Sequence, residues 1–136
     1  MRMAEAGLAV GAAARPTLPD AGGEAEPGSY RDRNGAIFYH DGGVFRAISA
    51  KALADWQRLS KTAFFRRFVD QGAIVATELA ADPPPVPAPG DWAGVLAHAR
   101  IPVVSYPYEW PFGMLQAAAL LHLDLMQAAL AEDMIL

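Results

Sequence analysis

Residues 101–112 read Ile-Pro-Val-Val-Ser-Tyr-Pro-Tyr-Glu-Trp-Pro-Phe. The first five form an apolar run between polar segments, which predicts a buried strand over residues 101–105. Four aromatic residues and two prolines follow, a combination that favours a rigid turn with a large contact area. A long apolar segment then runs to the last residue, Leu136. We therefore predict a strand, an aromatic turn and a long helix in succession.

The segment 112–136 carries apolar residues on most sides of a helix, and such a helix is usually buried in a larger domain. Gln116, His122 and Asp124 interrupt the apolar run, so the segment does not resemble a membrane span. No helix-ending signal is apparent before Leu136, which suggests that the helix or the chain continues. In this chain alone we expect one helix face to stay exposed and to favour self-association.

Net charge and cysteine content limit the classes of partner and the cellular compartment that fit this chain. The chain of 136 residues has a formal net charge of -4 and no cysteine. Nucleic-acid and anionic-membrane binding need clustered Lys and Arg, and the short cluster around Arg66 and Arg67 is too small. We therefore expect neither a nucleic-acid nor a membrane partner. The absence of cysteine is consistent with a cytoplasmic protein.

The N-terminal segment 1–29 is rich in Ala, Gly and Pro and shows no periodicity. It has too little bulky apolar surface to offset the entropy of ordering, so we predict a disordered leader. Glu5 and the short apolar stretch argue against a signal peptide. Order should begin near Tyr30, and residues 30–136 should form one module.

Local signals within this module predict an antiparallel sheet with flanking helices, which is an α+β fold. Segments 36–40 and 44–48 have strand character, and Asp41-Gly42-Gly43 between them supplies a tight hairpin turn. Ser49 can cap a helix over 50–59.

A second set of signals completes the predicted elements. Ser60 can cap a helix over 61–71, and Gly72 fits the left-handed position after it. Residues 73–77 favour a short strand. The segment 80–90 is a proline-rich loop, and Asp91 can cap a short helix that carries Trp92, Val95 and Leu96.

No motif in the sequence supplies catalytic chemistry. His40, His98 and His122 lack metal-ligand spacing, and neither a dinucleotide fingerprint nor a Walker loop occurs. Asp41-Gly42-Gly43 could act as a glycine lid over a nucleotide, but a hairpin turn explains it more simply. We assign no catalytic, cofactor-binding or metal-binding residue.

The aromatic turn is the one candidate site. Tyr106, Tyr108, Glu109 and Trp110 could form a hinge that lines a ligand cleft, with Glu109 meeting a cation or backbone amides. The alternative is a connector between strand and helix that packs against the sheet.

Several stretches resemble the N-terminal region of a bacterial family of class I SAM-dependent methyltransferases, some of which are labelled host-specific nodulation protein. The segment 100–110, Arg-Ile-Pro-Val-Val-Ser-Tyr-Pro-Tyr-Glu-Trp, is the most specific of them. Weaker matches are Gly-Ser-Tyr-Arg-Asp at 28–32, Val-Phe-Arg-Ala-Ile at 44–48, Gly-Ala-Ile-Val at 72–75 and the helical segment 114–125.

The resemblance implies a fold like the N-terminal lobe of a kinase, followed by the first long helix of the second lobe. It also implies that the SAM site lies in a C-terminal methyltransferase domain that this sequence lacks. The missing C-terminal portion would then be the chain's natural partner, and the chain alone would be a non-catalytic fragment. A free-standing adaptor that uses the aromatic turn, and a degenerate kinase-like nucleotide binder, remain as alternatives.

Overall fold

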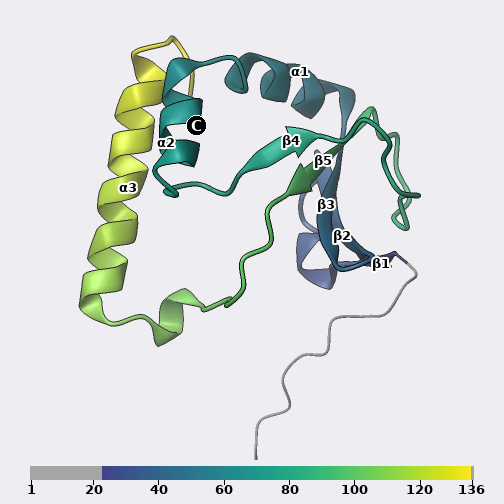
Figure 1. The fold of residues 1–136 in the computed structure, drawn as a ribbon, viewed down its shortest axis with the longest axis horizontal. Coiled ribbons are helices and arrows are strands. Elements are labelled where there is room, and N and C mark those ends of the chain that lie inside the picture. The colour runs from purple at the N-terminus through teal and green to yellow at the C-terminus, as the bar shows by residue number, and fades with distance from the viewer. Residues whose placement is uncertain (1–22, 136) are drawn as a thin grey trace, which may run out of the picture.

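The computed structural model describes residues 23–135 and has a mixed α and β architecture (Figure 1). Its strands are β1 Glu24–Ala25, β2 Gly35–His40, β3 Gly43–Ile48, β4 Thr77–Leu79 and β5 Gly94–His98. Its α-helices are α1 Ala50–Leu59, α2 Ala63–Asp70 and α3 Phe112–Leu130, and two short 3-10 helices are η1 Pro27–Ser29 and η2 Pro107–Glu109. The predicted α+β class is confirmed. None of the described helices is long and apolar enough to cross a membrane.

The strands form one antiparallel sheet in the order β1-β2-β3-β5-β4. The predicted hairpin is confirmed, because β2 pairs with β3 along its whole length. Asp41 and Gly42 both have positive φ, at 45° and 75°, as a two-residue hairpin turn requires. The helices α1 and α2 follow β3 in the chain, and β4 and β5 then add to its free side.

One hydrophobic cluster lies on a face of the sheet. Phe38, Ala47 and Val95 are its buried members. The proline-rich segment closes this face, since Val86 and Trp92 pack against the cluster. Trp92 Nε1 donates a hydrogen bond to the Ala88 carbonyl at 3.0 Å. The proline-rich loop therefore forms one wall of the sheet core.

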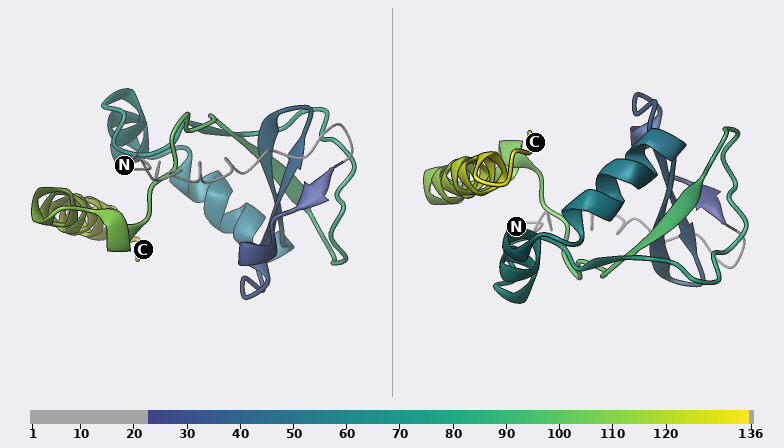
Figure 2. Two further views of the ribbon diagram at one scale, coloured as in Figure 1. Left: turned by 90° about the horizontal axis from the view of Figure 1, so that it is seen from below. Right: turned by 90° about the horizontal axis from the view of Figure 1, so that it is seen from above.

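A second cluster joins α2 to the C-terminal half of α3. Its buried members are Phe64, Phe68 and Ala129, and Leu121 and Leu125 pack around them. It shares no residue with the sheet cluster. In Figures 1 and 2, α3 lies beside α2 and apart from the sheet. The described residues thus form two small hydrophobic clusters.

The predicted strand over 101–105 is wrong, and so is the predicted helix after Asp91. The strand is Gly94–His98, which pairs with β3 and β4. Gly94 explains the difference, because a Cβ there would lie only 3.2 Å from Leu53 Cδ1, so α1 can pack closely over it. Residues 101–105 are exposed and unpaired, and Pro102 has no N–H to offer a sheet. The strand expected over 73–77 begins only at Thr77.

The prediction that the last helix lacks an ending signal is also wrong. α3 ends at Leu130, where Met134 N–H donates to the Ala129 carbonyl at 2.9 Å and Asp133 N–H donates to the Leu130 carbonyl at 3.2 Å. Asp133 has φ 53°. These features form a Schellman motif, in which an aspartate takes the left-handed position that glycine usually occupies.

Three other helix ends test the predicted caps. Gly72 has φ 67° after α2, so its predicted left-handed role is confirmed. The N-cap of α2 is Thr62 and not Ser60, because Thr62 Oγ1 accepts a hydrogen bond from Phe65 N–H at 3.3 Å. Ser49 caps α1 as predicted.

The structure describes only the last residues of the predicted leader, 23–29. Residues 1–22 lie outside the described residues. Within the described part, β1 pairs with β2, with Glu24 opposite Tyr39. Regular structure therefore begins before Tyr30, a few residues earlier than the sequence suggested.

Candidate functional site

The aromatic turn has a defined local geometry. Tyr106 N–H donates to Glu109 Oε2 at 3.2 Å, and Trp110 Nε1 donates to Ser105 Oγ at 2.9 Å. The rings of Tyr106 and Tyr108 stack, with centroids 5.6 Å apart and planes within 5°. The turn therefore brings the four predicted site residues together. Glu109 meets a backbone amide of its own turn, which is one of the two roles considered for it.

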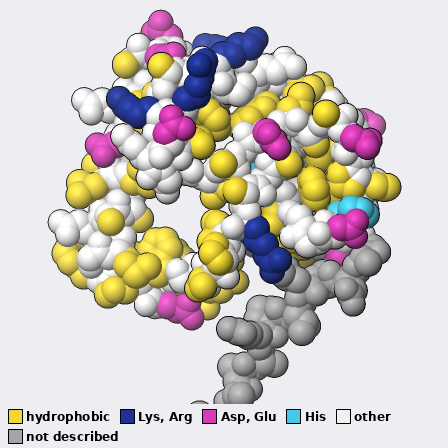
Figure 3. Space-filling model, viewed as in Figure 1, with side chains coloured by type: hydrophobic (Ala, Val, Ile, Leu, Met, Phe, Trp, Pro, Cys, Tyr) yellow, Lys and Arg dark blue, Asp and Glu magenta, His cyan; other side chains and the backbone are white. Residues whose placement is uncertain are grey.

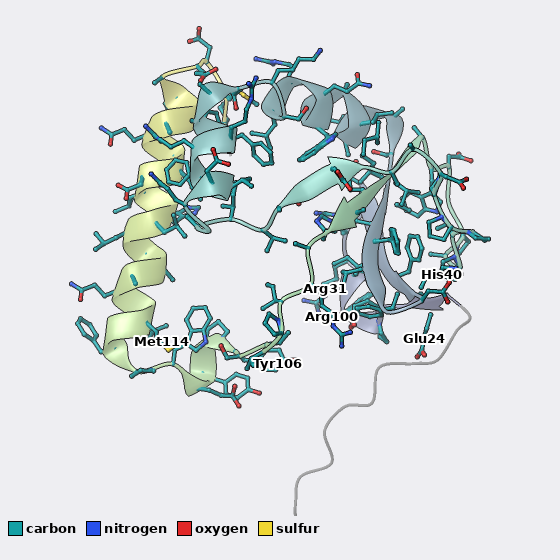
Figure 4. The ribbon with its side chains drawn as sticks, viewed as in Figure 1. Glu24, Arg31, His40, Arg100, Tyr106 and Met114 are labelled. Atoms are coloured by element: carbon teal, nitrogen blue, oxygen red, sulfur yellow. The ribbon has the colours of Figure 1, made fainter. Side chains whose placement is uncertain are left out.

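The turn presents its aromatic rings to solvent. Tyr108 is 83% exposed and Tyr106 is 53% exposed. No residue of η2 is buried, so the turn does not pack into the sheet. In the view of Figure 4, Tyr106 lies between Met114 at the foot of α3 and Arg100 after β5. Two parallel exposed rings offer a flat apolar surface to a partner.

The exposed apolar surface continues from the turn along α3. Figure 3 shows hydrophobic side chains over this part of the molecule, beside an opening between α3 and the sheet. The exposed large side chains of this region are Ile101, Val103, Val104, Tyr106, Tyr108, Phe112, Met114, Leu115, Leu120, Leu123, Met126 and Leu130. Many exposed large apolar side chains in one region are typical of interaction surfaces.

A groove lies between α2 and the ends of β4 and β5. Its volume is about 490 Å³, and it is open to solvent. Its lining combines apolar and charged side chains, namely Phe65, Arg66, Val69, Asp70, Glu78 and His98. The size lies within the usual range for small-molecule sites.

His98 is the perturbed titratable group of this groove. Its Nδ1 lies 2.9 Å from Thr77 Oγ1, across the β4–β5 ladder. Burial lowers the pKa of His98, and the nearby Arg46 charge lowers it further. The imidazole therefore favours its neutral form. From the sequence alone, His98 was expected to be an ordinary histidine, since its pairing with Thr77 depends on a strand that was not predicted.

A polar clamp lies beside the hairpin. Arg46 Nη2 is paired with Asp32 Oδ2, and Asn34 N–H donates to Asp32 Oδ1 at 2.9 Å. Partial burial acts to raise the pKa of Asp32, but the Asn34 hydrogen bond and the Arg46 charge outweigh it and the pKa is lowered. A Cβ on Gly35 would lie 2.6 Å from Arg46 Nε, so glycine makes room for the clamp. The clamp ties the loop before β2 to β3.

The pairing of Arg46 differs from the pairing expected of a kinase-like nucleotide binder. In protein kinases, a lysine on the third strand pairs with a glutamate on the following helix. Here the third strand carries Arg46, and its partner Asp32 comes from a loop. Asp41 and Gly42 form a tight turn within β2–β3. Residues 23–135 also contain no group of three potential metal ligands.

Comparison with known proteins gives one informative similarity. No protein-family model matches the chain, and no solved structure matches it. The chain is similar to a nodulation protein, NoeA of Rhizobium meliloti (strain 1021), with 34% identity over 98 residues. Those residues are 72% of this chain but only 20% of NoeA. The chain is therefore related to NoeA and spans about a fifth of its length.

Proposed function

We propose that this chain is the N-terminal, non-catalytic module of a longer SAM-dependent methyltransferase-like protein. The observation that carries the proposal is the match to NoeA, which takes in most of this chain but a fifth of the relative. On the resemblance noted in the sequence, SAM binding would belong to the part of the protein that follows. On this proposal the module alone is inactive, and the cofactor and methyl transfer belong to the remaining chain.

The uncovered surface of the module supports this assignment. About half of α3 has no covering neighbour within residues 23–135, since residues 111–120 are all exposed, and the aromatic turn before it is exposed as well. Apolar surface of this extent is unfavourable in water unless a partner covers it. The missing C-terminal portion of the same protein is the natural partner, and a cytoplasmic location fits the proposal.

The proposal is tested by titrating SAM into two proteins by calorimetry. One is the chain of residues 1–136, and the other is the full-length protein encoded by its gene. We expect binding only by the full-length protein. A full-length protein that binds no SAM contradicts the methyltransferase assignment, and stoichiometric binding by residues 1–136 contradicts the non-catalytic assignment. Unchanged circular dichroism of residues 1–136 before and after titration serves as the folding control.

The second candidate function is a free-standing adaptor that uses the aromatic turn. The stacked, exposed rings of Tyr106 and Tyr108 favour it. For this function, Tyr108→Ala should weaken partner capture by residues 1–136, while Tyr30→Ala, at another exposed tyrosine, should not. Equal capture by both variants contradicts the adaptor function.

A further inference from the structure

β4 forms one edge of the sheet. It ends the strand order β1-β2-β3-β5-β4, and among the described elements it packs mainly on β5 (Figure 1). An edge strand carries backbone N–H and C=O groups that another extended chain can bind. β4 reads Thr-Glu-Leu and has neither proline nor lysine, the residues that commonly block such an edge. The strand at the other edge, β1, has only two residues, so β4 offers the longer edge.

The register of β4 shows which of its backbone groups face outward. Ala80 N–H donates to the Val95 carbonyl of β5 at 2.9 Å. Alternate residues of an antiparallel strand bond to the partner strand, so the backbone groups of Glu78 also face β5, and those of Thr77 and Leu79 point away from it. No described residue bonds to the backbone of Thr77 or Leu79. Each of the two therefore offers one donor and one acceptor to an added strand.

Glu78 determines which charge an added strand should carry. In a strand that pairs antiparallel with β4, the residue opposite Glu78 lies in a non-hydrogen-bonded pair, where the side chains are closest. Glu78 is exposed, and no ion pair is found for it within residues 23–135. Opposite charges in such a pair are stabilising and like charges are destabilising. The edge therefore favours a lysine or arginine opposite Glu78.

A second copy of this chain fits the edge less well than a basic segment. Two β4 strands that pair antiparallel over their whole length place the two Glu78 side chains opposite each other, at the closest position. An extended segment of another protein can carry a basic residue there. Its C-terminal side would pass Thr77 toward Ala76, where Phe65 and Val69 of α2 line the groove described above. The groove then has room for an apolar side chain of that segment.

We propose that the outer edge of β4 binds an extended basic segment of another protein by antiparallel strand addition. The N–H and C=O groups of Thr77 and Leu79 supply the main-chain hydrogen bonds, and Glu78 selects the basic side chain. In this mode of recognition the main chain gives affinity and the side chains give specificity. The proposal goes beyond the methyltransferase assignment and does not depend on it.

The test measures the fluorescence anisotropy of a labelled peptide of alternating valine and threonine with a central lysine. The full-length protein encoded by the gene is titrated to about 1 mM, which detects weak binding. We expect the lysine peptide to bind, and a peptide with glutamate at its centre to bind at least roughly threefold more weakly. N-methylation of the two residues that flank the lysine should abolish binding, because their N–H groups face β4. N-methylation of the lysine itself should not, because its N–H faces away.

Protein variants locate the bound peptide. Leu79→Pro removes an outward N–H and no bond to β5, and it should weaken binding of the lysine peptide roughly fivefold. Glu78→Lys should reverse the preference between the lysine and glutamate peptides. Glu132→Lys changes an exposed carboxylate that follows α3 and should leave the preference unchanged.

Four results would overturn the proposal. They are no binding of the lysine peptide, equal binding of the peptide methylated beside the lysine, binding that neither Leu79→Pro nor Glu78→Lys alters, and a dimer that Leu79→Pro dissociates in sedimentation. The last result would identify a second copy as the occupant of the edge. Circular dichroism checks the folding of each variant, and the methylated peptides test the unaltered protein if Leu79→Pro does not fold.

Discussion

Replacing Phe68 with alanine should detach α3 from α2 while the sheet stays folded. Phe68 is 6% exposed and is one of three buried residues in the cluster between these helices. Truncating a buried phenylalanine typically costs about 3–5 kcal/mol. Because the cluster has only three buried residues and can relax, we take about 3 kcal/mol, which shifts the docking equilibrium roughly 150-fold.

Amide hydrogen exchange of the separate elements measures this effect. In Phe68→Ala, the amides of α3 should lose protection by about two orders of magnitude, in line with the lost docking energy. The amides of β3 should keep theirs, because Phe38, Ala47 and Val95 form a cluster that Phe68 does not touch.

Phe65→Ala is the matched control on the same helix. Phe65 packs edge-to-face on Trp56, with ring centroids 5.3 Å apart, and is not part of the α2–α3 cluster. Phe65→Ala should leave the amides of α3 protected from exchange. The reasoning is refuted if Phe68→Ala exposes β3 as much as α3, since the two cores would then unfold as one.

Three further predictions concern single side chains. Folding lowers the pKa of Asp32, so its carboxylate contributes its full stabilisation above about pH 4, and the free energy of unfolding falls as the pH drops through the lowered pKa. In urea unfolding, Asp32→Asn should show a flatter dependence of this free energy on pH in that range. The pKa of His98 is also lowered in the folded state, so folding favours the neutral imidazole. The free energy of unfolding should therefore fall as the pH drops from about 6.5 through the lowered pKa. His98→Gln should remove this loss, and an unchanged pH profile would contradict the burial of His98. Asp133→Gly should raise the midpoint of thermal unfolding, since a non-glycine residue in the left-handed region costs about 1 kcal/mol. Glu132 does not have a positive φ, so Glu132→Gly should not raise the midpoint.

Local signals predicted the hairpin and α1 well. The tight turn at Asp41 and Gly42, and the cap at Ser49, act within a few residues, so their geometry follows from nearby sequence. The error over residues 91–105 has a different origin. The apolar run after Ile101 looked like a strand, but the neighbouring run from Gly94 to His98 pairs with β3. Which of two adjacent runs joins the sheet depends on distant packing, in this case of Leu53 over Gly94.

The candidate site was predicted only in part. The aromatic turn was identified from composition, and its four residues do lie together. The groove with His98 was missed, because its walls come from α2 and from two strands whose positions were predicted incorrectly. The end of α3 was missed because Asp133 adopts a conformation for which glycine is the usual signal.

The central claim is that these residues belong to a longer polypeptide, and the size of the natural protein tests it most directly. An antibody raised against residues 23–135 can be used to blot an extract of the cells that make the protein. The account predicts a single band several times heavier than 14.5 kDa, the mass of this chain. A stable band at 14.5 kDa as the only product would contradict it.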